Sequence, residues 1–561
     1  MSSSSPSPSP PPRSRSRPAR QLAVFSIHST IFLSLISLRI LNAVTVRTFF
    51  QPDEYFQAIE PAWNLAFGNG GWLTWEWRHS LRSAAHPLLF AGLYRAVSFT
   101  CTVLHVSEAQ QAEALAIAPR VLQALFAAMG DWATARLAGV LWGSDVGWIS
   151  LCLSLGSAWG WFCGTRTFAN SLETVVTALA LSVWPWRWAT ADRSRPRQQR
   201  SEVRFAMGLA ALACVLRPTN ILVWLALGAF AVWNTNGRRR VILVAEASWI
   251  GAAVFMANAL IDKAYYGEWT FPPLTFLKFN VVHSLSIFYG RNDWHYYLSQ
   301  GLPLLLTTFL PLALYALYCS LAIGRTSSPA FQLASTIVGV VATYSLIAHK
   351  EVRFLYPLLP LLHVLSAKSF QDLSWSTKTK NRVLAGMILL NLPVAYYTSM
   401  VHQRGVIDVM QHLGATSSEW NSAGFLMPCH STPWKGALGG ALDKKDMWAL
   451  TCEPPIDMEP EVRAAYVDEA DQFYADPKAF VQKFVGDGKR YKWPERLAVF
   501  EALVKEDAGK SLWGGLYEEC WRGFNTHWHD DDRRRGDVVV FCLRDEMDGK
   551  EPVEMVVSEM F

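Results

Sequence analysis

Two adjacent carboxylates, Asp53 and Glu54, stand in the segment RTFFQPDEYFQ (residues 47–57), a few residues after the first long apolar run of the chain. A carboxylate at the edge of a membrane can accept the proton of an attacking hydroxyl, as a general base does. A pair just past a helix end can also be merely solvated. Because Pro52 breaks the helix there, we predict that the turn presents Asp53 as a catalytic base, with Glu54 as its substitute or orienting partner.

The residues after this pair are rich in aromatic side chains. They include Tyr55, Phe56, Trp63, Trp72, Trp75 and Trp77. Trp and Tyr are enriched where a membrane meets water, and flat rings stack well on sugar rings. The combination favours the joining of a sugar from a lipid-borne donor to a hydroxyl acceptor.

Three further polar groups interrupt apolar sequence. In TRTFANSLET, Arg166, Asn170 and Glu173 fall on one helix face, although a capped helix start would explain them too. Arg217 in LRPTN lies in the middle of an apolar run, where a cation needs a counter-charge or a phosphate. HKEVRF (349–354) packs further charges between two apolar runs, and Arg is well suited to grip phosphate. We predict phosphate binding by His349, Lys350 and Arg353, with Arg166 and Arg217 as weaker candidates.

The composition places most of the chain in a membrane. Of the 561 residues 51% are hydrophobic and only 17% are charged, Trp numbers 25, and the mean hydropathy is positive. The formal net charge of +5 is spread over short basic clusters between apolar runs. A nucleic-acid partner is therefore not expected, because such proteins carry a broad basic patch.

About 20 mostly apolar residues are needed to cross a bilayer. By that measure 10–12 spans are expected, and the candidates are 22–42, 87–105, 119–142, 147–163, 172–190, 205–233 (broken at Arg217-Pro218), 241–262, 301–323, 331–348, 353–370 and 382–401. The Ser/Pro-rich residues 1–21 are predicted to be a disordered cytoplasmic tail, and 22–401 to form the membrane domain.

The basic connectors set the expected topology. Those at 193–204, 236–240, 324–326 and 376–382 are predicted to be cytoplasmic, which makes 263–300, 349–354 and everything after 402 lumenal. The first half conflicts with this scheme. Three candidate spans between 87 and 163 would put residues 165–173 on the cytoplasmic side, so one of the three must be re-entrant or wrong.

Residues 402–561 have the composition of a globular domain that is long enough for its own core. Four of the nine cysteines fall there, namely Cys429, Cys452, Cys520 and Cys542. In an oxidising lumen they permit one or two disulfides in three pairings, and free buried thiols are the alternative. The other five cysteines lie in or beside apolar runs and are expected to pack there.

Four motifs in order resemble a known family. PDEYFQ, TWEW (74–77) followed by Arg82, RTFANSLET and HKEVRF are similar to motifs of the dolichyl-phosphate-mannose-dependent mannosyltransferases of glycosyltransferase family 22. The resemblance implies a mostly α, polytopic GT-C fold, here with a C-terminal lumenal α/β domain. The tail segments FLMPCHSTPW (425–434) and HWHDDDRRRGDVVV (527–540) resemble the members that act on the glycosylphosphatidylinositol (GPI) precursor.

The resemblance also implies a reaction. It is the inverting α-1,2 transfer of the third mannose from dolichyl-phosphate mannose to the dimannosyl GPI glycolipid, in the endoplasmic reticulum membrane with a lumenal catalytic face. Substrate-binding roles are expected for Trp75, Glu76, Arg82, Asn170, Glu173 and Glu351. The alternatives are a sister enzyme that acts on the N-glycan precursor or adds the fourth GPI mannose and, from another class, a polytopic transporter. The sequence predicts no particular protein partner.

No cofactor or metal is expected, since the donor is itself a substrate and its monophosphate needs less neutralisation than a diphosphate. The run DDD (530–532) with His527 and His529 resembles a metal-binding DxD motif. Because DDDRRR neutralises itself locally, we interpret it as a solvated or structurally paired loop.

Overall fold

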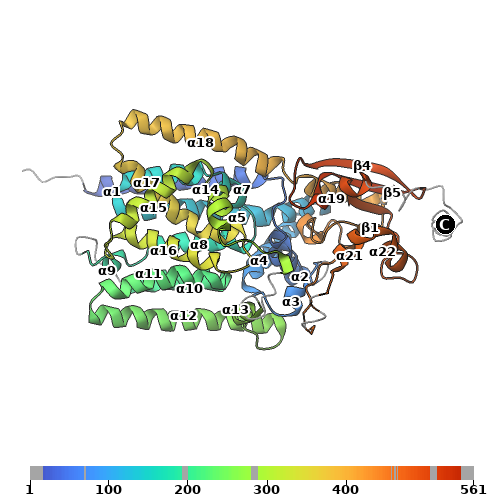
Figure 1. Cartoon of the computed structure of the whole chain (residues 1–561), viewed down its shortest axis with the longest axis horizontal. Helices are drawn as coiled ribbons and strands as arrows, with labels where there is room; N and C mark the ends of the chain where they lie inside the picture. The colour runs from blue at the N-terminus through green and yellow to red at the C-terminus, as the bar shows by residue number, and fades with distance from the viewer. Residues whose placement is uncertain are drawn as a thin grey trace, which may run out of the picture.

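The computed structural model describes residues 17–544, apart from 69–70, 193–199, 280–287, 457, 460–462, 464 and 506–514. Long helices run side by side along the molecule, and a β-sheet covers one end of this bundle (Figure 1). We call the two ends of the bundle the sheet end and the far end. The chain enters α1 at Arg17, within the predicted tail, and residues 1–16 lie outside the described residues.

The bundle is built from apolar helices. They are α1 Arg17–Thr45, α5 Glu108–Trp142, α6 Ser144–Leu155, α7 Ala158–Cys163, α8 Ala169–Ser182, α9 Trp186–Ala189, α10 Arg200–Leu216, α11 Ile221–Asn234, α12 Gly237–Tyr266, α13 Pro272–Leu277, α14 Leu302–Leu306, α15 Leu310–Ala322, α16 Pro329–Ser345, α17 Leu359–Asp372 and α18 Thr377–Met400. Four described runs are long and apolar enough to cross a membrane: α5, α12, Tyr297–Ala322 and α18. In lipid the backbone must satisfy its own hydrogen bonds, and a helix does this within one segment.

One predicted span is wrong. Arg166 Nη1 donates to Glu54 Oε2 over 2.9 Å, so the segments after α1 and before α8 meet at one end of the bundle. Between these segments the chain makes two passes along the bundle, α5 and α6–α7, and so returns to the end at which it started. A third pass over 87–105 would leave it at the opposite end. The helix there, α4 Ala85–Val103, starts beside the last turns of α12, where the Ala84 N–H donates to Asp262 over 2.8 Å, and it leads into the first turn of α5.

The residues between α1 and α5 fill the sheet end. They form the π-helical turn η1 Tyr55–Ile59, then α2 Glu60–Phe67, α3 Trp75–Arg78 and α4. Apolar side chains of α4, such as Phe90 and Tyr94, pack against Trp63 of α2. The sequence could not distinguish this surface from a lipid-facing one, because both are apolar. With α4 removed from the spans, residues 165–173 return to the side predicted from the basic connectors.

The break predicted at Arg217-Pro218 is confirmed. α10 ends at Leu216, a short turn Pro218–Asn220 follows, and α11 begins at Ile221. Proline lacks the N–H that would continue the helix. The far end of α11 is held by Asn234, whose amide donates to Ala189 O (3.0 Å) and Thr326 O (2.7 Å).

The residues after α18 form a separate α/β layer around a five-stranded sheet of order β2-β1-β3-β5-β4. Its elements are α19 Gly405–Ala415, β1 Ser422–Phe425, β2 Asp446–Ala449, α21 Glu469–Ala475, α22 Pro477–Phe484, β3 Arg496–Phe500, α23 Glu501–Lys505, β4 Tyr517–Thr526 and β5 Gly536–Leu543. β1 runs parallel to β2 and β3, whereas β5 is antiparallel to β3 and β4. The predicted C-terminal α/β domain is confirmed.

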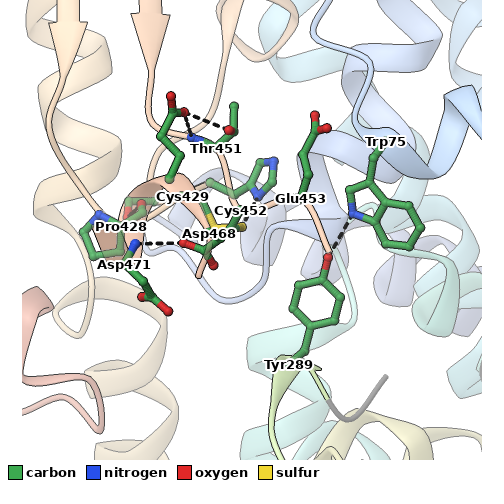
Figure 2. Close-up of a disulfide and its surroundings, with 12 residues drawn as sticks. Trp75, Tyr289, Pro428, Cys429, Thr451, Cys452, Glu453, Asp468 and Asp471 are labelled. Carbon is green, nitrogen blue, oxygen red and sulfur yellow. Dashed lines mark hydrogen bonds between the residues drawn. A yellow bond between two sulfur atoms is a disulfide. The ribbon is translucent and has the colours of Figure 1, made fainter. Parts of the chain in front are cut away.

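Both faces of this sheet are covered, as the alternation of side chains along β5 requires. Val538 and Val540 pack in a cluster with α19, while Val539 and Phe541 pack in another with α21 and α22. Two disulfides, Cys429–Cys452 and Cys520–Cys542, tie the layer together, and the first is drawn in Figure 2. The prediction of one or two disulfides is confirmed, and the alternative of free thiols is wrong.

The sheet layer is attached to the bundle through hydrogen bonds to Glu60, which is fully buried. Its carboxylate accepts N–H donation from Trp72 (3.4 Å), Gly436 (3.2 Å) and Ala437 (3.3 Å), so one side chain joins α2 to the turn Lys435–Leu438. Close by, Gly439 has φ +62°, and a Cβ there would lie 2.0 Å from the carbonyl oxygen of Ala112. Only glycine fits this approach.

This junction predicts a pH dependence of stability. Burial raises the pKa of Glu60 from 4.5 to about 8, because it outweighs the three N–H donors that favour the charged form. The folded state then binds more protons than the unfolded state between these two values, so stability falls as the pH rises through that window. We expect a loss of a few kcal/mol, about 1.4 per pKa unit.

The measurement is the unfolding midpoint of the purified protein from about pH 5 to pH 9, for wild type and Glu60→Gln. The variant cannot ionise, so its stability should decline less than that of wild type over this range. Parallel pH curves for the two proteins would contradict the assignment.

Candidate active site

Asp53 sits in a tight turn at the sheet end of the bundle. Pro52 ends the preceding segment, and its carbonyl accepts the N–H groups of Tyr55 and Phe56 (both 2.9 Å). The chain continues as the π-helical turn η1, a form that occurs often at functional sites. The side chain of Asp53 keeps 16% of its surface exposed, whereas that of Glu54 keeps 2%. Of the two acids, Asp53 is the accessible one.

The carboxylate of Asp53 meets Arg353, some 300 residues further along the chain. Arg353 also grips Glu351 with two donors, Nε to Oε2 (2.7 Å) and Nη2 to Oε1 (2.8 Å). Behind this pair, His349 Nε2 lies 3.2 Å from Glu351 Oε1. The HKEVRF motif is thus folded into a network that ends on the predicted base.

The charged groups within HKEVRF stabilise one another in their ionised forms. Burial alone would raise the pKa of Glu351, but Arg353 and His349 hold it well below its usual range. Burial alone would lower the pKa of His349, yet the hydrogen bond and charge of Glu351 raise it. Glu351 is therefore an ionised anchor that orients Arg353.

Glu54 and Arg166 form a second ion pair inside the protein, with 1–2% of either side chain exposed. The other donors of Arg166 are also used, by Phe162 O (2.9 Å), Thr48 O (2.7 Å) and Thr48 Oγ1 (2.8 Å). Thr167 Oγ1 donates to the backbone oxygen of Glu54 over 2.9 Å. This geometry favours a structural role for both charges, in which they fix the turn that carries Asp53.

Glu173 is the centre of a third group. Its carboxylate accepts the amides of Asn170 (3.1 Å) and Asn220 (2.8 Å), and Arg217 Nε lies 3.9 Å away. Arg217 also stacks over the ring of Phe354, 5.3 Å from its centroid. Among the described residues, the guanidinium of Arg217 makes no hydrogen bond, and its one ion pair is this long contact with Glu173.

Trp75, Glu76 and Arg82 come from the segment around α3. Arg82 donates to Glu76 Oε1 through Nη2 (2.6 Å) and Nε (3.1 Å), and Gln57 Nε2 donates to Glu76 Oε2 (3.0 Å). Figure 2 shows the Trp75 indole donating to the hydroxyl of Tyr289, a bond of 2.9 Å. Arg82 is close enough to Asp53 and Arg353 to interact with both charges.

The two remaining predicted cations hold backbone. Lys350 Nζ donates to the carbonyl of Asn292 (2.8 Å), whose side-chain amide returns to Lys350 O (2.9 Å). His349 Nδ1 lies 3.1 Å from Gly290 O. These contacts tie HKEVRF to the loop before η5 (Tyr297–Gly301), and they favour positioning over direct phosphate binding.

A cleft opens beside this constellation. Its polar wall holds Gln57, Arg82 and Ser83, and its apolar wall includes Leu216, Pro218 and Phe276. A cleft with Arg82 at one side and apolar surface at the other suits an amphiphile with an anionic head. Arg82, Arg217 and Arg353 lie close to Asp53, so a proton acceptor and an anion site adjoin.

The DxD-like run lies at the edge of this site, since Asp530 is near enough to Tyr296 to act on it together with Glu351. Asp531 accepts Nε (2.8 Å) and Nη2 (2.9 Å) of Arg533, and Asp532 pairs with Arg535 (2.7 Å). Asp531 and Asp532 are therefore paired locally with arginines of the same loop, as the sequence predicts. Cys429, His430 and Cys452 also gather, but the two sulfur atoms are bonded to each other.

Two contributors were not identified from the sequence. Gln57 follows Asp53 by one turn and orients Glu76, and Asn220 bridges to Glu173 from the turn after Arg217. Both stood inside the polar motifs QPDEYFQ and LRPTN. The sequence signal that could have identified them is a side-chain amide close to a charged residue within apolar sequence.

Comparison with known proteins is informative over most of the chain. The model of the Alg9-like mannosyltransferase family matches residues 30–438. GPI mannosyltransferase 3 of Aspergillus fumigatus is 43% identical, over 92% of this chain and 77% of its own. The protein of that name from Yarrowia lipolytica is 41% identical, over 92% and 97%. GPI alpha-1,2-mannosyltransferase 3 of Mus musculus is 36% identical, over 90% and 87%.

Among solved structures, ArnT from Cupriavidus metallidurans bound to undecaprenyl phosphate is similar in fold, with a TM-score of 0.56 and 11% identity. The alignment covers 91% of this chain and 97% of ArnT. The predicted GT-C fold is confirmed.

Proposed function

The chain belongs to the Alg9-like mannosyltransferase family, and on that premise we propose that it adds the third mannose of the GPI precursor. The donor is dolichyl-phosphate mannose, and the acceptor is the 2-hydroxyl of the second mannose of the dimannosyl glycolipid. The product linkage is α-1,2, formed with inversion. The chain is a glycosyltransferase, and the names of its relatives support this particular acceptor.

The observation that carries the mechanism is the accessible carboxylate of Asp53 beside Arg353, Arg82 and Arg217. Inversion requires a single in-line displacement. The acceptor oxygen bonds to the anomeric carbon as the bond from that carbon to the phosphate oxygen breaks. Asp53 takes the hydroxyl proton, and dolichyl phosphate leaves as an anion. Fixed cations around that anion lower the barrier without a metal or an acid.

The predicted residues then divide by role. Arg217 and Arg82 bind the donor phosphate, and Arg353 joins them while Glu351 holds it in place. Glu54 and Arg166 keep the turn of Asp53 in position, and Asn170 and Glu173 orient Arg217. The apolar wall of the cleft by Leu216, Pro218 and Phe276 accommodates the first isoprene units.

A location follows from the same proposal. The enzyme lies in the endoplasmic reticulum membrane with the sheet end in the lumen, where a lipid-linked sugar donor is available. The lumenal domain begins after α18, near residue 402, and the membrane domain occupies 22–401. Two disulfides in the sheet layer agree with an oxidising compartment.

The experiment uses microsomes from cells that lack this activity, complemented with the chain. We expect dolichyl-phosphate mannose to convert the dimannosyl GPI precursor to the trimannosyl form. The N-glycan precursor and the trimannosyl GPI glycolipid serve as control acceptors and should stay unchanged. Elongation of a control acceptor instead of the dimannosyl precursor, by a well-expressed protein, would overturn the assignment in favour of a sister enzyme.

A further inference from the structure

A second recess lies on the other side of α13 from the active-site cleft. It is wide and open to its surroundings, and its lining includes Arg78, Glu268, Trp269, Thr270, Leu274 and Lys278. The first cleft takes Pro272, Pro273 and Phe276 from the same helix region. The segment after α3 is divided likewise, with Arg78–Ser80 in the second recess and Leu81–Ser83 in the first.

The lining of the second recess combines cations with membrane-facing apolar groups. Arg78 and Lys278 are exposed, and the lining also holds one acid, Glu268. Trp269 is 52% and Leu274 58% exposed, as expected of side chains that meet lipid. α13 follows directly from the lumen-proposed end of α12, so the recess sits at the level of the membrane surface.

Two polar groups of this lining lack a strong partner within the described residues. Thr270 is buried, with a relative exposure of 9%, yet its Oγ1 has no hydrogen-bond partner among the described residues. Arg78 is paired only with Glu453 in the described structure, and their side chains are 58% and 44% exposed. A solvent-exposed pair of this kind contributes little, so Arg78 can exchange Glu453 for a phosphate at small cost.

We propose that this recess binds the phosphodiester head of the acceptor glycolipid, an inference that rests on the proposed function. The donor phosphate is attached to the reacting carbon and must lie beside Asp53. The acceptor phosphate is separated from the reacting hydroxyl by several sugar units, and two anions repel each other. The acceptor therefore needs its own cationic recess at the membrane surface, and the one across α13 supplies Arg78, Lys278 and the unpaired Thr270 hydroxyl.

The test is steady-state kinetics of the purified full-length enzyme with the double variant Arg78→Gln/Lys278→Gln. Losing two charge-assisted contacts to phosphate should raise KM for the dimannosyl glycolipid about tenfold or more, while kcat and KM for dolichyl-phosphate mannose stay unchanged. A water-soluble dimannosyl glycan without the lipid phosphate should react equally with variant and wild type. Lys492→Gln, an exposed lysine outside the recess, is the matched control.

Every outcome is decisive. An unchanged KM for the glycolipid, or an equal loss with the soluble glycan, would overturn the proposal. A raised KM for the donor would assign the recess to dolichyl phosphate instead. Failure of wild type to elongate the glycolipid would reject the proposed function itself, which separates that result from failure of the recess alone. An unchanged unfolding midpoint of the variant shows that the fold is intact.

Discussion

Asp53→Asn is expected to lower the rate of mannosyl transfer by about 10²–10⁴-fold, the usual contribution of a general base. The amide is isosteric and can still accept from Arg353, so the ion-pair network should keep its shape. Only the proton acceptor is lost. The measurement is single-turnover conversion of the dimannosyl acceptor, with the enzyme in excess over the acceptor and the donor saturating.

The matched control is Asp446→Asn, which removes an exposed acid of β2 in the sheet layer. It should retain wild-type activity at equal expression. Substrate affinities should also survive in Asp53→Asn, because the group that binds the donor phosphate is unchanged. Full activity in Asp53→Asn would show that another group removes the proton, and Glu54→Gln would then be the next variant.

Arg166→Ala is expected to destabilise the protein by about 3–5 kcal/mol, the usual cost when one partner of a buried ion pair is removed. Glu54 would stay buried without its counter-charge, and both acceptors on Thr48 would lose their donor. The measurement is the unfolding midpoint in detergent. The double variant Arg166→Ala/Glu54→Gln should recover part of the loss, because no unpaired charge then remains.

A different result would restore the role predicted from sequence. If Arg166→Ala kept the wild-type midpoint but raised KM for dolichyl-phosphate mannose, Arg166 would bind the donor phosphate. The matched comparison is Arg217→Ala, which loses a single 3.9 Å pairing with Glu173 and a stacking contact. That variant should affect donor KM more than stability.

The helices and the motifs could be predicted from the sequence because their signals are local. Apolar runs of membrane length, a proline after Arg217 and acids after a helix end each depend on neighbouring residues only. The prediction of a membrane span over 87–105 was wrong because it too used only neighbouring residues. α4 is apolar because it packs on α2, and a run of apolar residues does not say whether lipid or protein will cover it.

The roles of the cations were not local. Arg166, Lys350 and Arg353 are all basic groups in or beside apolar sequence, and the sequence made each of them a candidate phosphate ligand, Arg166 a weaker one. In the folded chain Arg166 uses its donors on Thr48, Phe162 and Glu54, whereas Lys350 meets a carbonyl. Whether a guanidinium pairs inside the protein or stays available to a ligand depends largely on distant partners, such as Thr48 and Glu54, which are more than 100 residues from Arg166.

The sequence by itself determined a chain embedded largely in a membrane, a pair of acids after its first apolar run and a cysteine-bearing tail, since hydropathy and residue chemistry are properties of short segments, and the resemblance of its motifs added the GT-C fold. The tertiary structure decided which acid is accessible, which arginines remain available, how the cysteines pair and that α13 separates two recesses. The physical reason is that charge pairing and burial are set by distances between segments. Those distances exist only after the helices have packed.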